Sequence, residues 1–156
     1  MPDPADIDAR RAGPDDAAEV ARLLHDFNTE FDTPTPGPAT LTSRLESLLV
    51  EPMTVAYLAG EPAAGVALVT LRRNVWYDGP VALLDELYVA PERRSQGLGA
   101  AMIRLLIADA DELGVSAIEI NVDAGDVDAQ RFYERLGFSG ADPDTGERAF
   151  YYSLEL

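Results

Sequence analysis

The sequence contains no cysteine, no lysine and only one histidine, His25. Without thiols the chain has no disulfide bond, no thiolate metal ligand and no cysteine nucleophile. A single imidazole argues against histidine metal clusters and against a Ser/His catalytic arrangement, so we expect no metal. The missing lysine also removes the GxxxxGK[ST] motif, which leaves a Walker-type nucleotide site unsupported.

Positive charge and long apolar runs are also scarce. Asp and Glu number 28 against 12 basic residues, all of them arginine, and the net charge is −16. Phosphate backbones require a basic face, so we expect no nucleic-acid partner. The apolar stretches are too short to span a bilayer and the first ten residues are acidic, which predicts a cytoplasmic protein without membrane contact. The negative charge would attract a cationic substrate. Solubility, a genome that favours acidic residues or a salty cytoplasm explains the same charge more simply.

A chain of 156 residues is the size of one ordinary domain. We expect residues 1–5 to be disordered and residues 6–156 to form a single domain. Apolar periodicity, with breaks at Gly and Pro, predicts alternating strands and helices. The predicted helices are 15–31, 41–49, 97–114 and 127–138, and the predicted strands are 7–12, 53–59, 63–73, 80–89, 115–122 and 148–156. This order indicates an α/β fold with a mixed sheet, in which the strands at 80–89 and 115–122 are parallel and joined by a right-handed crossover.

The segment YVAPERRSQGLGAAMIRLL, residues 88–106, places two glycines where a buried strand is followed by a helix. Gly97 and Gly99 would allow positive φ and a close approach to a ligand, and the first turn of the helix presents unpaired N–H groups. Together with Arg93 and Arg94, these groups suit a phosphate or pyrophosphate. A tight turn with incidental arginines is the alternative. The spacing is not GxGxxG, so the dinucleotide fingerprint is absent.

This segment resembles the acetyl-CoA loop of the GCN5-related N-acetyltransferase (GNAT) family. The family's [R/Q]xxGx[G/A] order is matched by Val89, Pro91, Arg94, Gly97, Gly99 and Ala100. A second motif, AQRFYERLGF, is similar in Ala129, Phe132, Tyr133, Gly137 and Phe138. The resemblance implies a single-domain GNAT fold, with splayed parallel strands flanked by about four helices and with acetyl-CoA as co-substrate.

The resemblance also implies where acetyl-CoA binds. The pantetheine arm would bond to the backbone of the strand, the pyrophosphate would lie on the amides of the glycine loop, and residues of the last strand and helix would line the far side. The residues implied for the pantetheine arm are Leu87, Tyr88 and Val89. Those implied for the pyrophosphate are Arg94, Ser95, Gln96, Gly97, Leu98, Gly99 and Ala100. Those implied for the far side are Asn121, Asp126 and Tyr133. Asp126 departs from the family, whose members often have Asn there, but it still caps a helix.

Acetylation of an amine needs a base, an oxyanion donor and an acid for the departing thiolate. The resemblance makes Tyr133 the acid and the N–H near Val89 the oxyanion donor, whereas packing of the Tyr133 ring is the alternative role. Strand alternation would place Asp85 and Glu86 on opposite faces, so only one can face the acceptor. The family's base positions favour Asp85, unless it anchors substrate while a water chain carries the proton.

The resemblance also implies that the end of the first helix and the proline loop after it cover the acceptor pocket. Phe27 and Phe31 lie there and would line the acceptor pocket, although their helical spacing favours core packing. The predicted function is transfer of an acetyl group from acetyl-CoA to a primary amine of a small, cationic molecule or a peptide, by direct attack in a ternary complex. A CoA-binding regulatory module without turnover and a phosphate-binding module without CoA are the alternatives. The protein would be a monomer or a homodimer.

Overall fold

The computed structural model describes residues 7–156, so the expected disorder of residues 1–5 lies outside the described residues. Contacts within the chain form two compact units, Met1–Glu119 and Ile120–Leu156. The single domain expected over residues 6–156 stays a prediction. None of the helices in the described part of the chain is long and apolar enough to cross a membrane.

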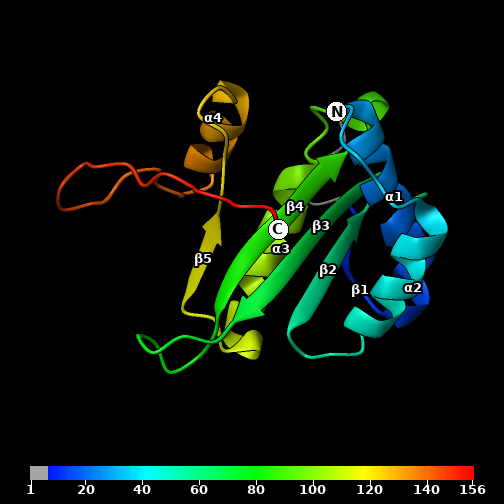
Figure 1. The fold of residues 1–156 in the computed structure, drawn as a ribbon, viewed down its shortest axis with the longest axis horizontal. Coiled ribbons are helices and arrows are strands. Elements are labelled where there is room, and N and C mark those ends of the chain that lie inside the picture. Colours follow the sequence, from blue (N-terminus) through cyan, green and yellow to red (C-terminus); the bar gives the residue numbers. More distant parts are fainter. Residues whose placement is uncertain (1–6) are drawn as a thin grey trace. The chain divides into compact units, whose positions relative to one another are not determined.

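Five strands form one mixed sheet in the order β1-β2-β3-β4-β5 (Figure 1). They are β1 (Ala9–Ala12), β2 (Thr54–Ala59), β3 (Gly65–Arg72), β4 (Val81–Val89) and β5 (Ala117–Ile120). The first four strands are antiparallel to their neighbours: β1 pairs with β2, β2 with β3 and β3 with β4. Helix α3 (Leu98–Leu113) connects β4 to β5, which are neighbours in the sheet, as the strand–helix–strand pattern predicts. The predicted α/β class with a mixed sheet is therefore confirmed.

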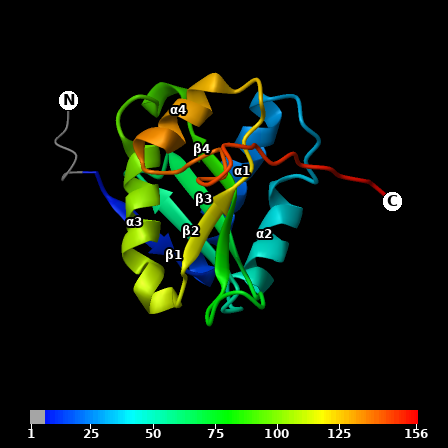
Figure 2. The ribbon, with the colours of Figure 1, turned by 90° about the vertical axis from the view of Figure 1, so that its left-hand side faces the viewer.

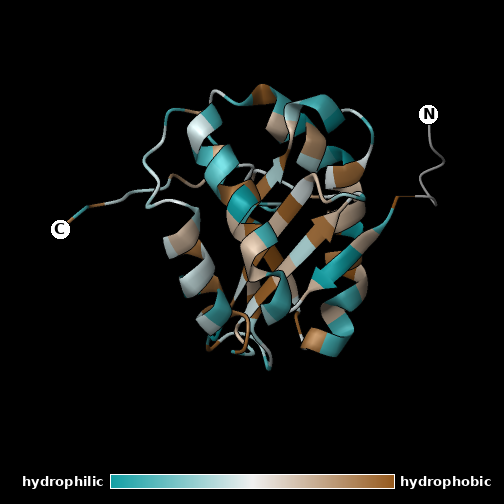
Figure 3. Ribbon diagram, turned by 90° about the vertical axis from the view of Figure 1, so that its right-hand side faces the viewer, coloured by the Kyte–Doolittle hydropathy of each residue, from teal (hydrophilic) through white to brown (hydrophobic). Residues whose placement is uncertain are grey.

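Helices cover both faces of this sheet. Helices α1 (Ala17–Glu30) and α2 (Pro38–Leu48) lie on one face and α3 lies on the other (Figure 2). Val20 and Leu23 of α1 belong to a buried cluster with residues of β2, β3 and β4, while α3 buries Met102 and Ile103. Apolar and polar positions alternate along helices and strands in Figure 3, as expected for elements that bury one side.

Short 3-10 helices lead into α1 and into the loop before α3. The first, η2 (Pro14–Asp16), is held by the Asp16 carboxylate, which accepts hydrogen bonds from the Gly13 N–H and from Arg10 at 2.9 and 2.7 Å. The second, η3 (Pro91–Arg93), follows β4 directly. Proline favours the first helical position and cannot donate to a strand ladder. Pro91 therefore marks the end of β4 and begins the turn that leads into the β4–α3 loop.

The second unit contains helix α4 (Val127–Arg135). The Asp126 carboxylate accepts a hydrogen bond from the Ala129 N–H at 2.9 Å, so the predicted cap is confirmed. The closing strand predicted over residues 148–156 is wrong, because the described chain has no strand there and Phe150, Tyr151 and Tyr152 are largely exposed. An alternating apolar pattern shows that a segment fits a sheet, but a strand also needs a partner strand to pair with.

Candidate active site

The backbone of β4 turns different groups to its two sides. Beyond the strand end, the Ala90 N–H donates to the Ala64 carbonyl at 2.8 Å. Hydrogen-bonded and non-hydrogen-bonded pairs alternate in an antiparallel ladder, so the N–H and C=O of Tyr88, two positions earlier, point toward β3. Those of Leu87 and Val89 point away from β3. Leu87 and Val89 thus have the direction expected of groups that bond a ligand beside β4, whereas the Tyr88 backbone faces the sheet instead.

The loop between β4 and α3 presents a row of backbone N–H groups. In the described part of the chain, no hydrogen bond uses the N–H of Ser95, Gln96 or Gly97. Helix α3 begins at Leu98, and its first N–H groups lack intrahelical partners, since the Ala101 N–H is the one that reaches the Gly97 carbonyl, at 2.9 Å. The free row is therefore Ser95 to Ala100. The Arg94 N–H, also predicted to belong to it, donates to the Pro91 carbonyl at 3.3 Å.

Positive φ occurs at Gly97 but not at both predicted glycines. Gly97 precedes α3 with φ 88°, while Gly99 is the second residue of that helix and has helical backbone. The other left-handed residue of the loop is Ser95, with φ 60°. A Cβ on Gly97 would lie 2.8 Å from the Cδ1 atom of Ile7. The loop therefore depends on Gly97 for its shape, and nothing in the sequence indicated the left-handed backbone of Ser95.

The side chain of Arg94 is engaged within the protein. Its Nε donates to the Val89 carbonyl at 2.9 Å, and its Nη2 donates to both carboxylate oxygens of Glu30 at 2.8 and 2.7 Å. Tyr88 donates its hydroxyl to Glu30 at 3.1 Å. The expected free charge beside the loop is thus paired at Arg94. Glu30, the last residue of α1, carried no signal in the sequence that could have identified it.

A β-bulge brings Asp85 and Glu86 to the same face of β4. Leu68 of β3 is paired with Glu86, and the next residue of β3 is paired with Leu84, so Asp85 is an extra residue without a partner. Directly paired residues share a face, and Leu68 packs in the cluster beneath α1 and α2. Asp85 accepts a hydrogen bond from Thr70, which shares the face of Leu68. The prediction that alternation separates the two carboxylates is therefore wrong.

The two carboxylates differ in their surroundings. Asp85 is exposed and held by Thr70, whereas Glu86 is half-buried. Burial raises the pKa of Glu86 above the usual range of a carboxyl group, and the negative charge of Asp85 raises it further. Glu86 consequently holds a proton more readily than an ordinary glutamate does, as a general base requires.

Aromatic side chains extend from the end of β4 along α1. Tyr88 is buried, and burial together with the Glu30 carboxylate raises its pKa to about 12. Phe27 lies edge-on to Tyr88 at 5.1 Å between ring centroids and 5.4 Å from Phe31. Phe27 also packs against the core cluster, whereas 58% of Phe31 is exposed. The expected core role therefore fits Phe27, which is partly buried, and Phe31 is the more accessible of the two rings.

The second unit holds the remaining predicted residues. Tyr133 is 7% exposed and lies edge-on to Phe132 at 5.0 Å and to Phe138 at 5.6 Å between centroids. Burial, with a smaller effect of the Asp126 carboxylate, raises the pKa of its phenol. The Tyr133 hydroxyl makes no hydrogen bond within residues 120–156. Asn121 is exposed. The ring thus packs while its hydroxyl keeps its proton available.

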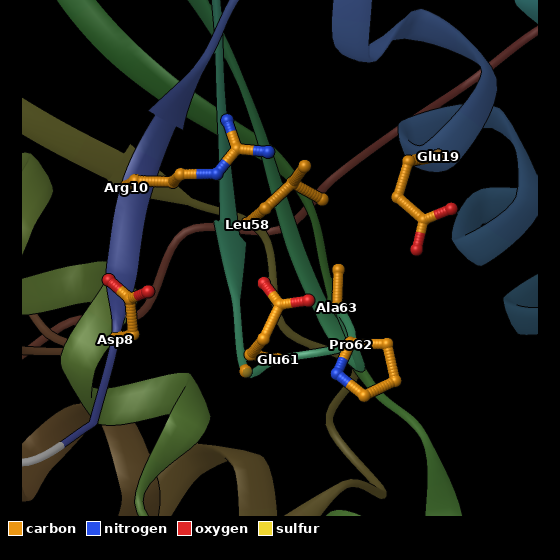
Figure 4. Close-up of a pocket in the computed structure, with 8 residues that line it drawn as sticks. Asp8, Arg10, Glu19, Leu58, Glu61, Pro62 and Ala63 are labelled. Carbon is orange, nitrogen blue, oxygen red and sulfur yellow. The ribbon is translucent and has the colours of Figure 1, made fainter.

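A cavity of about 210 Å³ lies elsewhere in the first unit, between the start of β1 and the β2–β3 turn. Figure 4 shows Asp8 and Arg10 on one side of it and Glu61 and Pro62 on the other. Arg10 is already paired with Asp16 at 2.7 Å. None of the predicted site residues lines this cavity, and residues 7–156 contain no group of His, Asp and Glu side chains arranged to hold a metal ion.

Comparison with known families decides the classification. Residues 18–138 match the profile of the acetyltransferase (GNAT) family. The chain belongs to the GNAT family. This membership covers both sequence motifs and confirms the predicted enzyme class, an acetyl-CoA dependent N-acetyltransferase.

Individual relatives agree with this assignment. An aminoglycoside N(6')-acetyltransferase type 1 from Serratia marcescens is 28% identical over 129 residues, which cover 79% of this chain and 85% of that protein. The crystal structure of an Arthrobacter sp. FB24 protein described as an acetyltransferase is 52% identical, with a TM-score of 0.89 and 96% of each chain covered. AAC(6')-Iy in complex with the bisubstrate analogue CoA-S-monomethyl-acetylneamine has a TM-score of 0.76 at 17% identity, covering 96% of this chain and 99% of that one, and shows the fold alone. The predicted GNAT fold is thus confirmed.

Proposed function

We propose that this GNAT enzyme transfers the acetyl group of acetyl-CoA to a primary amine of a small, cationic molecule, by direct attack in a ternary complex. One observation carries the proposal. The bulge in β4 turns Asp85 and Glu86 to one face of the strand whose carboxyl end leads into a row of unused N–H groups. A proton acceptor and an anion site therefore belong to the same strand and the loop that follows it.

The donor site would be formed by β4 and the loop after it. The N–H and C=O groups of Leu87 would bond the pantetheine arm, whereas the Val89 carbonyl already accepts a hydrogen bond from Arg94. The amides from Ser95 to Ala100 would hold the pyrophosphate. The loop amides fit the donor because no hydrogen bond in the described chain uses the N–H groups of Ser95 to Gly97, and those of Leu98 to Ala100 lack intrahelical partners. Asn121, Asp126 and Tyr133, which belong to the second unit, keep the acetyl-CoA binding role that the resemblance to the family implies.

Each catalytic task has a candidate residue. The raised pKa of Glu86 suits it to remove the proton from the acceptor ammonium, while Asp85 would anchor the cation. The amine nitrogen then forms its bond to the thioester carbonyl carbon, and the Val89 N–H would stabilise the oxyanion. As the carbon–sulfur bond breaks, Tyr133 would give its proton to the thiolate. Burial suits it to this role because the raised pKa keeps the phenol protonated.

A polyamine such as an amino sugar fits the acceptor site best. The net charge of −16 and the adjacent carboxylates favour a cation, and Phe31 offers an exposed ring at the end of α1. The relative from Serratia marcescens is an aminoglycoside N(6')-acetyltransferase, which supports the same chemical class. We expect the enzyme to act in the cytoplasm, as a monomer or a homodimer.

Two assays test the proposal. Acetyl-CoA at 100 times its dissociation constant should stabilise the protein by about 2.7 kcal/mol, whereas ATP and NAD should stabilise it little. A panel of amines, assayed with acetyl-CoA by detection of the free thiol, should give the highest kcat/KM with cationic polyamines, falling as salt rises. Thiol release that no amine accelerates would contradict the proposed transfer, and a preference for neutral or anionic amines would contradict the acceptor class.

A further inference from the structure

Glu30 links the end of α1 to the donor loop. Its carboxylate accepts two hydrogen bonds from the Arg94 guanidinium and one from the Tyr88 hydroxyl. Arg94 in turn reaches back to the Val89 carbonyl and lies over the ring of Tyr88, with 5.7 Å from its Cζ atom to the ring centroid. Three hydrogen bonds thus join residues that are 58 and 64 positions apart in the chain.

These contacts fix the direction of the Arg94 side chain. Nε donates to the carbonyl at the end of β4, and Nη2 donates to both oxygens of the Glu30 carboxylate in charge-assisted hydrogen bonds. The Arg94 N–H is bonded to Pro91 as well. The residue is therefore held at both its backbone and its side chain immediately before Ser95, where the free N–H row begins.

We propose that Glu30 is a positioning residue for the donor site. Glu30 holds Arg94 in place, and Arg94 supports the β4–α3 loop and is not a phosphate ligand. The inference rests on the proposed donor site. Pairing with Glu30 neutralises the guanidinium and keeps it on Val89, so the phosphates are met by the backbone N–H groups that the support holds in place. Because Phe27 and Phe31 belong to the same end of α1, the support also joins the acceptor side to the donor side.

The two possible roles of Arg94 predict opposite effects of Glu30→Gln. If Arg94 is a support, the change loosens the loop, and the dissociation constant of CoA should rise about fivefold, the effect of an oriented ion pair near the surface. If Arg94 is a phosphate ligand restrained by Glu30, the change frees the guanidinium and CoA should bind more tightly. Glu19→Gln is a matched control, because Glu19 pairs with Arg22 at 2.8 Å on the same helix and its described side-chain hydrogen bonds go to Arg22 and not to the β4–α3 loop.

The experiment measures CoA binding by calorimetry for the wild type, Glu30→Gln, Arg94→Gln and the double variant, with NMR detection of the Arg94 Nε–H in the ligand-free protein. The inference predicts a similar loss of CoA affinity in both single variants and little further loss in the double variant. It also predicts faster exchange of the Arg94 Nε–H in Glu30→Gln than in the wild type or in Glu19→Gln. Tighter or unchanged binding in Glu30→Gln, or an equal loss in Glu19→Gln, would overturn it. A wild type that does not bind CoA would overturn the proposed donor site itself.

Discussion

Alanine at Gly97 adds a methyl group at a residue with left-handed backbone. With φ at 88°, an L-residue is strained by about 1–2 kcal/mol. The added Cβ would also lie 2.8 Å from the Cδ1 atom of Ile7, but this is the end of a flexible side chain and can move aside. At about 2–4 °C per kcal/mol for a chain of this length, Tm should fall by roughly 2–8 °C.

The same substitution should weaken CoA binding, because Gly97 lies within the free N–H row. Gly114→Ala is the matched control: Gly114 ends the same helix with φ 68°, and a Cβ there meets nothing within 4 Å. It should lower Tm by a similar amount and leave the dissociation constant of CoA unchanged. Thermal unfolding and calorimetry measure both quantities. A Gly97→Ala protein with reduced Tm but wild-type CoA affinity would refute the position of the donor site, and an unchanged Tm would refute the strain argument.

Three further substitutions follow from the structure. Tyr133→Phe keeps the packed ring and removes the hydroxyl that would donate the proton, so kcat in steady-state assays should fall by roughly 10² to 10⁴ with little change in CoA affinity. A variant that retains more than about a third of wild-type kcat at pH 7 would make Tyr133 a packing residue. Gly79→Ala should lower Tm strongly in a thermal melt, because its Cβ would lie 1.9 Å from the Gly114 carbonyl oxygen; an unchanged Tm would disprove that close approach. Glu86→Gln should raise Tm at pH 7 and not at pH 4. The reason is that the pKa of the Glu86 carboxyl is raised in the folded state, so the ionised carboxylate costs stability and the protonated carboxyl does not. A lower Tm at pH 7 would contradict this.

Local patterns in the sequence predicted the parts of this structure that depend on neighbouring residues. Helical spacing gave α1 and α3 nearly their observed bounds, and the glycine before α3 marked a left-handed residue at the helix start. The two motifs at 88–106 and 129–138 identified the GNAT family. Each of these features depends on residues that lie close together in the sequence, so residue type and periodicity are enough to predict it.

Features that depend on distant residues could not be read in this way. The bulge at Asp85 is defined by the register of β3 against β4, and a single extra residue reversed the predicted separation of the carboxylates. The pairing of Arg94 with Glu30 spans 64 positions and left no local pattern. Residues 148–156 had the alternation of a strand, but pairing requires a neighbouring strand that periodicity does not reveal.

The pH dependence of kcat/KM for Glu86→Gln, with a cationic amine as acceptor, tests the central claim most directly. If Glu86 is the base, wild-type kcat/KM falls as the pH drops through the pKa of its carboxyl, which burial and Asp85 hold above the usual range of glutamate. Glu86→Gln should lose roughly 10² to 10⁴ of kcat/KM near neutral pH, with less loss at high pH where the amine is already deprotonated, and Asp85→Asn should lose less. A Glu86→Gln enzyme with the wild-type pH profile and near-normal kcat/KM would contradict the account.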